Sequence, residues 1–97
     1  MIRLSVMYPK GDDVTFDHDY YRDTHMDLVR RHLGVLKTEV DTGIDGPYVS
    51  IGHLYYESMD SLAAAMAGSD AGLVLADVAN FTNAQAVMQV SETTIEP

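Results

Sequence analysis

The sequence predicts a single α+β domain in which strands and helices follow one another in the order β-α-β-β-α-β. Three observations support this prediction. The chain has 97 residues, enough for one domain and not two. Four stretches show strand-type patterns, and two helical stretches separate them in the order given. Turn residues lie between these stretches. This order is the ferredoxin-like split βαβ arrangement, and we expect residues 1–97 to form it as one domain.

The first predicted strand covers residues 2–8, where apolar side chains alternate with other side chains with a period of two. A helix is predicted over residues 16–33. Acidic residues lie at its start and basic residues at its end, as the helix dipole favours. Gly34 follows the helix and is suited to end it.

The second half of the chain supplies the remaining elements, which β-branched, aromatic and alanine-rich stretches define between turn residues. They are strands at residues 35–42 and 48–56, a helix opened by Ser58 and ended by Gly68, a short helix at residues 71–78, and a last strand at residues 84–95. In this order of elements, helices cover one face of the sheet only, and the bare face needs a partner. We therefore expect a homodimer in which two sheets meet face to face as a dimeric α+β barrel.

Composition excludes several classes of function. The chain has no cysteine, which excludes disulfides, thiol catalysis and cysteine zinc sites. Its formal net charge of −9 opposes binding to nucleic acid and to anionic membranes. No apolar run approaches the roughly 18 residues of a membrane span, and the first residues lack a signal-peptide pattern. We expect a cytoplasmic protein with no nucleic-acid or membrane partner.

Three histidines, His18, His25 and His32, share the apolar stripe of the predicted helix when each residue advances by about 100°. Neighbours in this set are seven residues apart, which is a rise of about 10.5 Å, so no two can bind one metal ion. We therefore predict no metal site. His25 lies in the middle of the helix, with Tyr21 one turn before it. It is either a structural histidine or a general acid/base and ligand-binding group, because imidazole titrates near neutral pH.

The predicted strand at residues 48–56 carries a fourth histidine. Alternation places His53 and Tyr55 on one face of this strand, and Gly52 beside His53 leaves room for a pocket. His53 is either a core histidine with a hydrogen-bond partner or a pocket residue. Asn80 belongs to a polar loop before the last strand, which is either a plain turn or the rim of a pocket.

Several segments resemble motifs of the EthD-like proteins. Tyr20-Tyr21-Arg22-Asp23-Thr24-His25-Met26 resembles the Tyr-Tyr-x-x-Thr-His-x motif of that family. Three further segments, Leu4-Ser5-Val6-Met7-Tyr8-Pro9, Ile51-Gly52-His53-Leu54-Tyr55-Tyr56 and Ala79-Asn80-Phe81-Thr82, are similar to family segments in the same order and spacing. The resemblance implies a dimeric α+β barrel. The family is named for a protein needed alongside a cytochrome P450 system in the degradation of ethyl tert-butyl ether.

Similar barrels include methylmuconolactone methylisomerases, polyketide cyclases and cofactor-free monooxygenases. In the methylisomerases, histidines on the first helix and the third strand line the active site, which implies His25 and His53 as catalytic residues here. Tyr21, Tyr55 and Asn80 are the candidate substrate-binding residues. A cysteine of the methylisomerase site has no counterpart in this chain, so that mechanism does not carry over intact.

The resemblance leaves two functions open. The first is a cofactor-free enzyme of isomerase, cyclase or oxygenase type, acting on a small apolar cyclic or oxygenated compound in a degradation or secondary-metabolite pathway. The second is a non-catalytic accessory protein that binds such a compound for an oxygenase system, such as a cytochrome P450 pathway of ether degradation. Both expectations involve a homodimer, a small apolar ligand and no cofactor.

Overall fold

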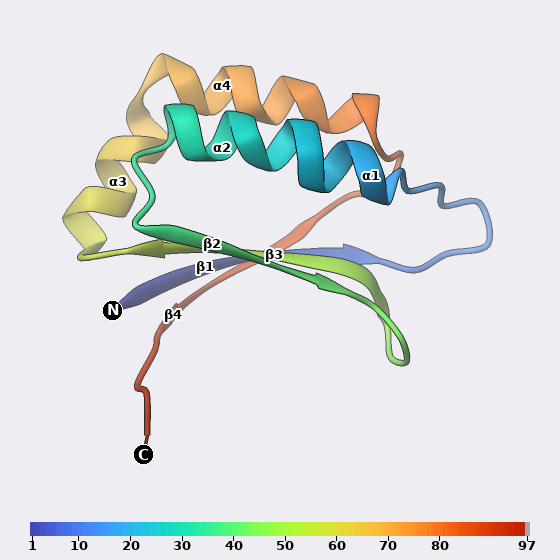
Figure 1. The fold of residues 1–97 in the computed structure, drawn as a ribbon, viewed down its shortest axis with the longest axis horizontal. Coiled ribbons are helices and arrows are strands. Elements are labelled where there is room, and N and C mark those ends of the chain that lie inside the picture. Colours follow the sequence, from blue (N-terminus) through green and yellow to red (C-terminus); the bar gives the residue numbers. More distant parts are fainter. Residues whose placement is uncertain (97) are drawn as a thin grey trace.

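The computed structural model of the protein describes residues 1–96 and contains a four-stranded antiparallel sheet with helices on one face (Figure 1). The strands are β1 (Ile2–Pro9), β2 (Lys37–Thr42), β3 (Tyr48–Tyr56) and β4 (Val87–Glu92). They lie in the order β2-β3-β1-β4, and each neighbouring pair is antiparallel. This topology confirms the predicted ferredoxin-like fold.

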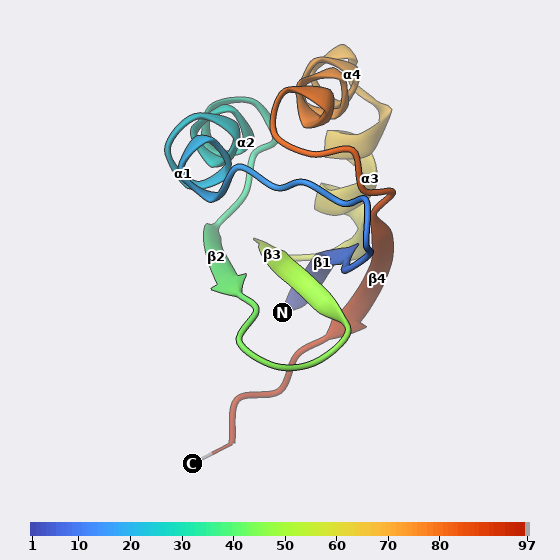
Figure 2. The same ribbon diagram turned by 90° about the vertical axis from the view of Figure 1, so that its right-hand side faces the viewer.

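The helices occur in two groups above the sheet (Figure 2). The first group is one continuous helical segment made of α1 (His18–Tyr20), the π-helical η1 (Tyr21–His25) and α2 (Met26–His32). The second group contains α3 (Met59–Ala67), α4 (Ser69–Ala76) and the 3₁₀ segment η2 (Asp77–Asn80). The predicted helix at residues 16–33 is therefore present, but its middle forms a wider π-turn. Ser58 caps α3 as predicted, because its side chain accepts a hydrogen bond from the Ser61 N–H group.

Two strands are shorter than predicted, and sheet pairing explains the difference for β4. This strand pairs only with β1, from Ile2 opposite Glu92 to Met7 opposite Val87. Residues before Val87 belong instead to a loop, in which Thr82 forms an isolated bridge with Phe16. The pattern of apolar residues continues past the point where β1 offers a partner, so the pattern alone overestimates the length of the strand.

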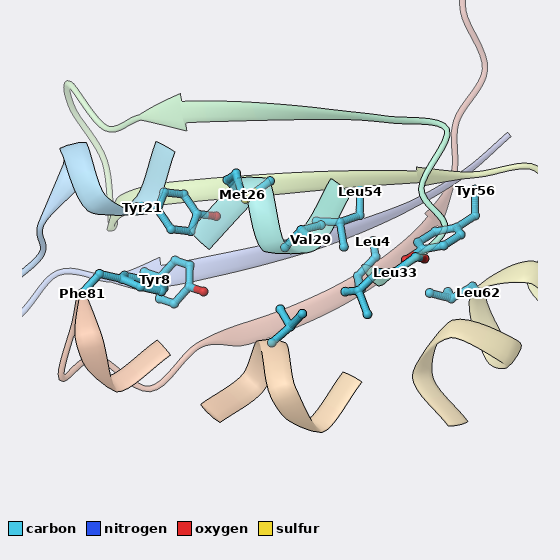
Figure 3. Close-up of a cluster of buried hydrophobic side chains, with 11 residues drawn as sticks. Leu4, Tyr8, Tyr21, Met26, Val29, Leu33, Leu54, Tyr56, Leu62 and Phe81 are labelled. Atoms are coloured by element: carbon cyan, nitrogen blue, oxygen red, sulfur yellow. The ribbon is translucent and has the colours of Figure 1, made fainter. Parts of the chain in front are cut away.

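The two faces of the sheet carry different side chains. Leu4, Tyr8, Leu54 and Tyr56 face the helices and belong to the hydrophobic core that Figure 3 shows in close-up. Arg3, Ser5 and Met7 of β1 and the odd-numbered residues of β3 point to the other face, where Figures 1 and 2 show no helix. Among the described residues, no single helix is long and apolar enough to cross a membrane. The helices at residues 59–67 and 69–80 meet the criteria of length and composition only as a pair, which is bent by 73°.

Candidate functional site

A pocket of about 330 Å³ lies between the helices and the sheet. Its walls are almost entirely apolar and come from β1, β3, β4 and the surrounding helices. Among the described residues that line it, only Tyr8, Tyr21 and His25 carry polar side-chain groups, and none carries a formal charge other than His25 when protonated. The apolar walls include Leu4, Val29, Leu33, Leu54, Val74 and Met88. A concave, mostly apolar space with a few converging polar groups is the usual form of a small-molecule site.

The π-helical turn determines which side chains of the first helix reach this pocket. The N–H group of Met26 donates to the carbonyl oxygen of Tyr21, five residues earlier. In a regular α-helix, a separation of five residues turns the side chains about 140° apart. The wider turn instead places Tyr21 and Met26 on the same face, where each is 1% exposed. His25, between them, is also buried and faces the pocket.

His25 contacts two aromatic rings. Its imidazole stacks on Tyr21, with ring centroids 5.6 Å apart, and contacts Phe81 at 4.6 Å. Its Nδ1 atom lies 3.0 Å from the Oδ2 atom of Asp77. Burial lowers the pKa of His25, and this effect outweighs the hydrogen bond and the negative charge of Asp77, which raise it. His25 is therefore neutral near pH 7.

Asp77, the first residue of η2, is the hydrogen-bond acceptor of the site. It accepts from the Tyr20 hydroxyl at 2.7 Å, from the Asn80 amide at 2.9 Å and from His25. Burial raises the pKa of Asp77. The three hydrogen bonds lower it by more than burial raises it, so the pKa lies below its ordinary value. An ionised Asp77 accepts the Nδ1–H of His25 and fixes the tautomer in which Nε2 keeps its lone pair. Nε2 has no protein hydrogen-bond partner within residues 1–96.

His53 and Tyr55 lie on the opposite face of the sheet. A Cβ atom added to Gly52 would meet the Tyr21 hydroxyl, so position 52 faces the helices and its neighbour His53 faces away from them. The two ring nitrogens of His53 lie 3.0 Å from Ser5 Oγ and 2.8 Å from a carboxylate oxygen of Asp41. One chain therefore does not bring His25 and His53 together.

The five predicted site residues thus fall into three groups. Tyr21 and His25 line the apolar pocket. His53 and Tyr55 lie across the sheet, where the Tyr55 hydroxyl donates to Glu39 at 2.6 Å. Asn80 does not line the apolar pocket but supports Asp77 and contributes to a separate open hollow beside Phe81. Among the described residues, no group of three His, Asp or Glu side chains is placed to hold a metal ion.

Sequence reasoning missed two residues of this site, Tyr8 and Asp77. Tyr8 occupies an apolar position of an alternating strand, and nothing in that pattern distinguishes it from a core residue. Asp77 lies 52 residues after His25, so no local spacing connects the two. One signal in the sequence could have indicated Asp77. Asn80 follows it three residues later, a spacing that lets the Asn80 amide donate to the Asp77 carboxylate at the start of a short helix.

The fold and the site define a small α+β protein with a mostly apolar, histidine-bearing pocket. Residues 10–85 match the family model described as the EthD domain. The chain belongs to the EthD domain family. Comparison with curated protein sequences finds no significant match.

Solved structures agree with this assignment. The chain is similar to an EthD-like protein from Ralstonia eutropha JMP134, with 33% identity and a TM-score of 0.90 over 99% of this chain and 94% of that one. An ethyl tert-butyl ether D (EthD) family protein from Bacillus halodurans C-125 shares 20% identity, with a TM-score of 0.76 over 97% and 99% of the two chains. A dimeric protein of ferredoxin-like fold from Bacteroides fragilis NCTC 9343 shares 9% identity, with a TM-score of 0.61 over 95% of both chains. The last two similarities show the fold alone.

Proposed function

We propose that this chain is an enzyme that moves a proton on a small, largely apolar compound, with His25 as the general base. One observation carries the proposal: a neutral imidazole, oriented by Asp77, lines a mostly apolar pocket, and its Nε2 atom has no protein partner among the described residues. A general base must be unprotonated at the working pH and must be held in a suitable orientation. The lowered pKa of His25 meets the first condition and its hydrogen bond to Asp77 meets the second.

The proposed step is the removal of a proton from a carbon atom next to a carbonyl group. The Nε2 atom of His25 takes the proton, and the electron pair of the C–H bond moves to form an enolate. The imidazolium that results is stabilised by the negative charge of Asp77, 3.0 Å from its Nδ1 atom. Returning the proton to the same or another carbon restores neutral His25. Isomerase-, cyclase- and oxygenase-type reactions of carbonyl compounds share this first step.

The apolar lining also favours a second function, that of an accessory protein that binds a small hydrophobic compound and passes it to an oxygenase. A pocket of about 330 Å³ with few polar groups retains an apolar ligand without any chemical step. The two functions differ in one respect only, because the enzyme needs the basicity of His25 and the carrier does not.

Deuterium exchange tests the proposal without knowledge of the natural substrate. The probe is 2-tetralone, a compact ketone with acidic C–H groups, followed by NMR in D₂O with and without the protein. We expect the protein to accelerate exchange above the buffer rate, and the His25→Gln variant to lose roughly 100-fold or more of that acceleration.

The matched control is His32→Gln, which removes a histidine at the end of the same helical segment, outside the pocket lining. It should exchange as fast as the unchanged protein. Equal exchange in the unchanged protein and in His25→Gln would refute the enzyme proposal. Binding of 2-tetralone without accelerated exchange would support the accessory function instead.

A further inference from the structure

We propose that the pocket selects an uncharged carbonyl compound, whose oxygen accepts hydrogen bonds from the hydroxyl groups of Tyr8 and Tyr21. This inference rests on the proposed function in that it names the ligand of the same pocket. It adds a residue, Tyr8, that is not among the five site residues predicted from the sequence, and it excludes a class of ligand, the carboxylates.

The first argument is that the hydroxyl groups of two buried tyrosines reach the pocket and have no partner among the described residues. Tyr8 is 2% exposed and Tyr21 is 1% exposed, and both line the pocket. Neither hydroxyl forms a hydrogen bond within residues 1–96. Neither oxygen is one of the described side-chain atoms that are both buried and unpaired, so both oxygens remain accessible. The hydroxyls of Tyr20, Tyr55 and Tyr56, by contrast, donate to protein oxygens at 2.7, 2.6 and 2.9 Å. A hydroxyl that opens into an apolar pocket without a protein partner is suited to donate to what the pocket binds, so the two open hydroxyls point to a ligand atom.

The second argument is that the two hydroxyls act together. The rings of Tyr8 and Tyr21 meet edge to face, with centroids 5.6 Å apart. Figure 3 shows both phenol oxygens directed toward the middle of the cluster of apolar side chains. The Tyr21 ring also stacks on His25. The two tyrosines and the proposed base therefore lie at the same end of the pocket, as recognition of one carbonyl group and its neighbouring C–H group requires.

The third argument concerns the protonation of the two tyrosines. Burial raises the pKa of Tyr8 to about 12, and burial together with the nearby Tyr8 raises the pKa of Tyr21. Both side chains therefore remain neutral hydrogen-bond donors at any working pH. A carbonyl oxygen has two lone pairs and can accept from both donors. The same two hydrogen bonds strengthen when the carbonyl becomes an enolate, as an oxyanion-binding site requires.

The fourth argument excludes anionic ligands. No Lys or Arg side chain lines the pocket among the described residues, and the chain has a formal net charge of −9. The charge nearest to the site is the carboxylate of Asp77, behind His25. A carboxylate ligand would lose its hydration in this pocket without gaining a cation in return. The volume of about 330 Å³ is at the lower end of the range for ligand pockets, roughly 300–1,000 Å³, so the ligand is compact.

Three probes of one ring size test the inference by calorimetric titration at pH 7.5. They are 2-tetralone, the hydrocarbon tetralin, and the carboxylate 1,2,3,4-tetrahydro-2-naphthoate. We expect the carboxylate to bind at least about tenfold more weakly than the ketone, because its charge is unpaired in the pocket. Tyr8→Phe and Tyr21→Phe should each weaken ketone binding roughly three- to tenfold, the effect of one hydrogen bond.

Tetralin makes no hydrogen bond, so its affinity should be the same in both variants, which also shows that their pockets are intact. Tyr55→Phe is the matched control on the opposite face of the sheet, and it should bind all three probes like the unchanged protein. The inference is overturned if 2-tetralone does not bind, if the carboxylate binds as tightly as the ketone, or if the double Tyr8→Phe, Tyr21→Phe variant keeps full ketone affinity. Ketone binding that depends on both tyrosines, without accelerated exchange, refutes the proposed function alone and leaves this inference standing.

Discussion

Tyr21 fits against the sheet because position 52 has no side chain. A Cβ atom added to Gly52 would meet the Tyr21 hydroxyl oxygen at less than contact distance. The next neighbours of that atom are Tyr21 Cζ at 3.4 Å and Met26 Sδ at 3.9 Å, which are ordinary contacts. The conflict at this position therefore comes from one oxygen atom.

This geometry predicts that substitutions at positions 52 and 21 are coupled. Gly52→Ala alone should lower the free energy of unfolding by about 1–3 kcal/mol, because the rigid phenol ring must shift in a packed core. In a Tyr21→Phe background, most of this cost should disappear, because phenylalanine lacks the oxygen. Denaturant unfolding of the two single variants and the double variant measures the coupling. Purely additive effects would show that Gly52 is required for another reason.

The same residues show how far sequence reasoning reaches at this scale. The sequence predicts that Gly52 leaves space for a pocket beside His53. The room exists, but the Tyr21 hydroxyl uses it from the helix side. Alternation along the strand assigns His53 and Gly52 to opposite faces, but it does not say which face the helices cover. That information comes from packing between segments that are distant in the sequence.

At the scale of elements, Asp77 joins the two groups of helices. It connects η2 to the first helical segment through hydrogen bonds from Tyr20 and His25. The sequence predicted the first helix and put Tyr21 and His25 on its inner stripe. It did not place Met26 there, because a uniform advance of about 100° per residue does not allow for a π-turn.

The contact between these elements predicts a pH dependence of stability. The pKa of His25 is lowered in the folded state from 6.5, so unfolded chains bind more protons in the range just below 6.5. The stability that neutral His25 contributes is therefore complete above about pH 6.5 and is lost as the pH falls through the lower folded-state pKa. Asp77, whose pKa is lowered from 3.8, adds a similar loss only in stronger acid.

Thermal unfolding between about pH 7.5 and pH 5 measures this dependence. The melting temperature of the unchanged protein should fall with decreasing pH, and the fall should be smaller in His25→Gln, which has no imidazole to protonate. His32→Gln removes a partly exposed histidine 3.8 Å from Asp70 and serves as the control. If His25→Gln and the unchanged protein lost stability in parallel, burial of His25 would not be the cause.

At the scale of the whole molecule, the two faces of the sheet have different roles. The pocket lies on the helix-covered face, whereas the other face is bare of helices (Figure 2). On this bare face, Met7 of β1 lies opposite Ile51 of β3. Arg3 of β1 points to the same face, and its Nε atom is buried without a hydrogen-bond partner among the described residues. The order of strands was enough to predict a one-sided sheet, and we expect a second copy of the chain to cover it.

The homodimer that we expect can be separated experimentally from the pocket, because the two lie on opposite faces. Light scattering after size exclusion should give twice the 10.7 kDa of one chain at micromolar concentration. Ile51→Glu should shift the protein toward the monomer, since a two-fold interface receives the buried charge twice. Leu73→Glu changes an apolar residue on α4 that is 50% exposed and should leave the mass unchanged.

A monomeric mass for the unchanged protein would contradict the expected dimer. If Ile51→Glu is monomeric and folded, binding of 2-tetralone to it decides what the dimer contributes to the site. His25, Tyr8 and Tyr21 all come from one chain and face away from the bare side of the sheet. We therefore expect the affinity of the monomeric variant for the ketone to lie within about threefold of that of the unchanged protein. The loss of one hydrogen bond would weaken binding by up to about tenfold. A larger loss would mean that contact between the two sheets is needed to hold the pocket in its binding shape.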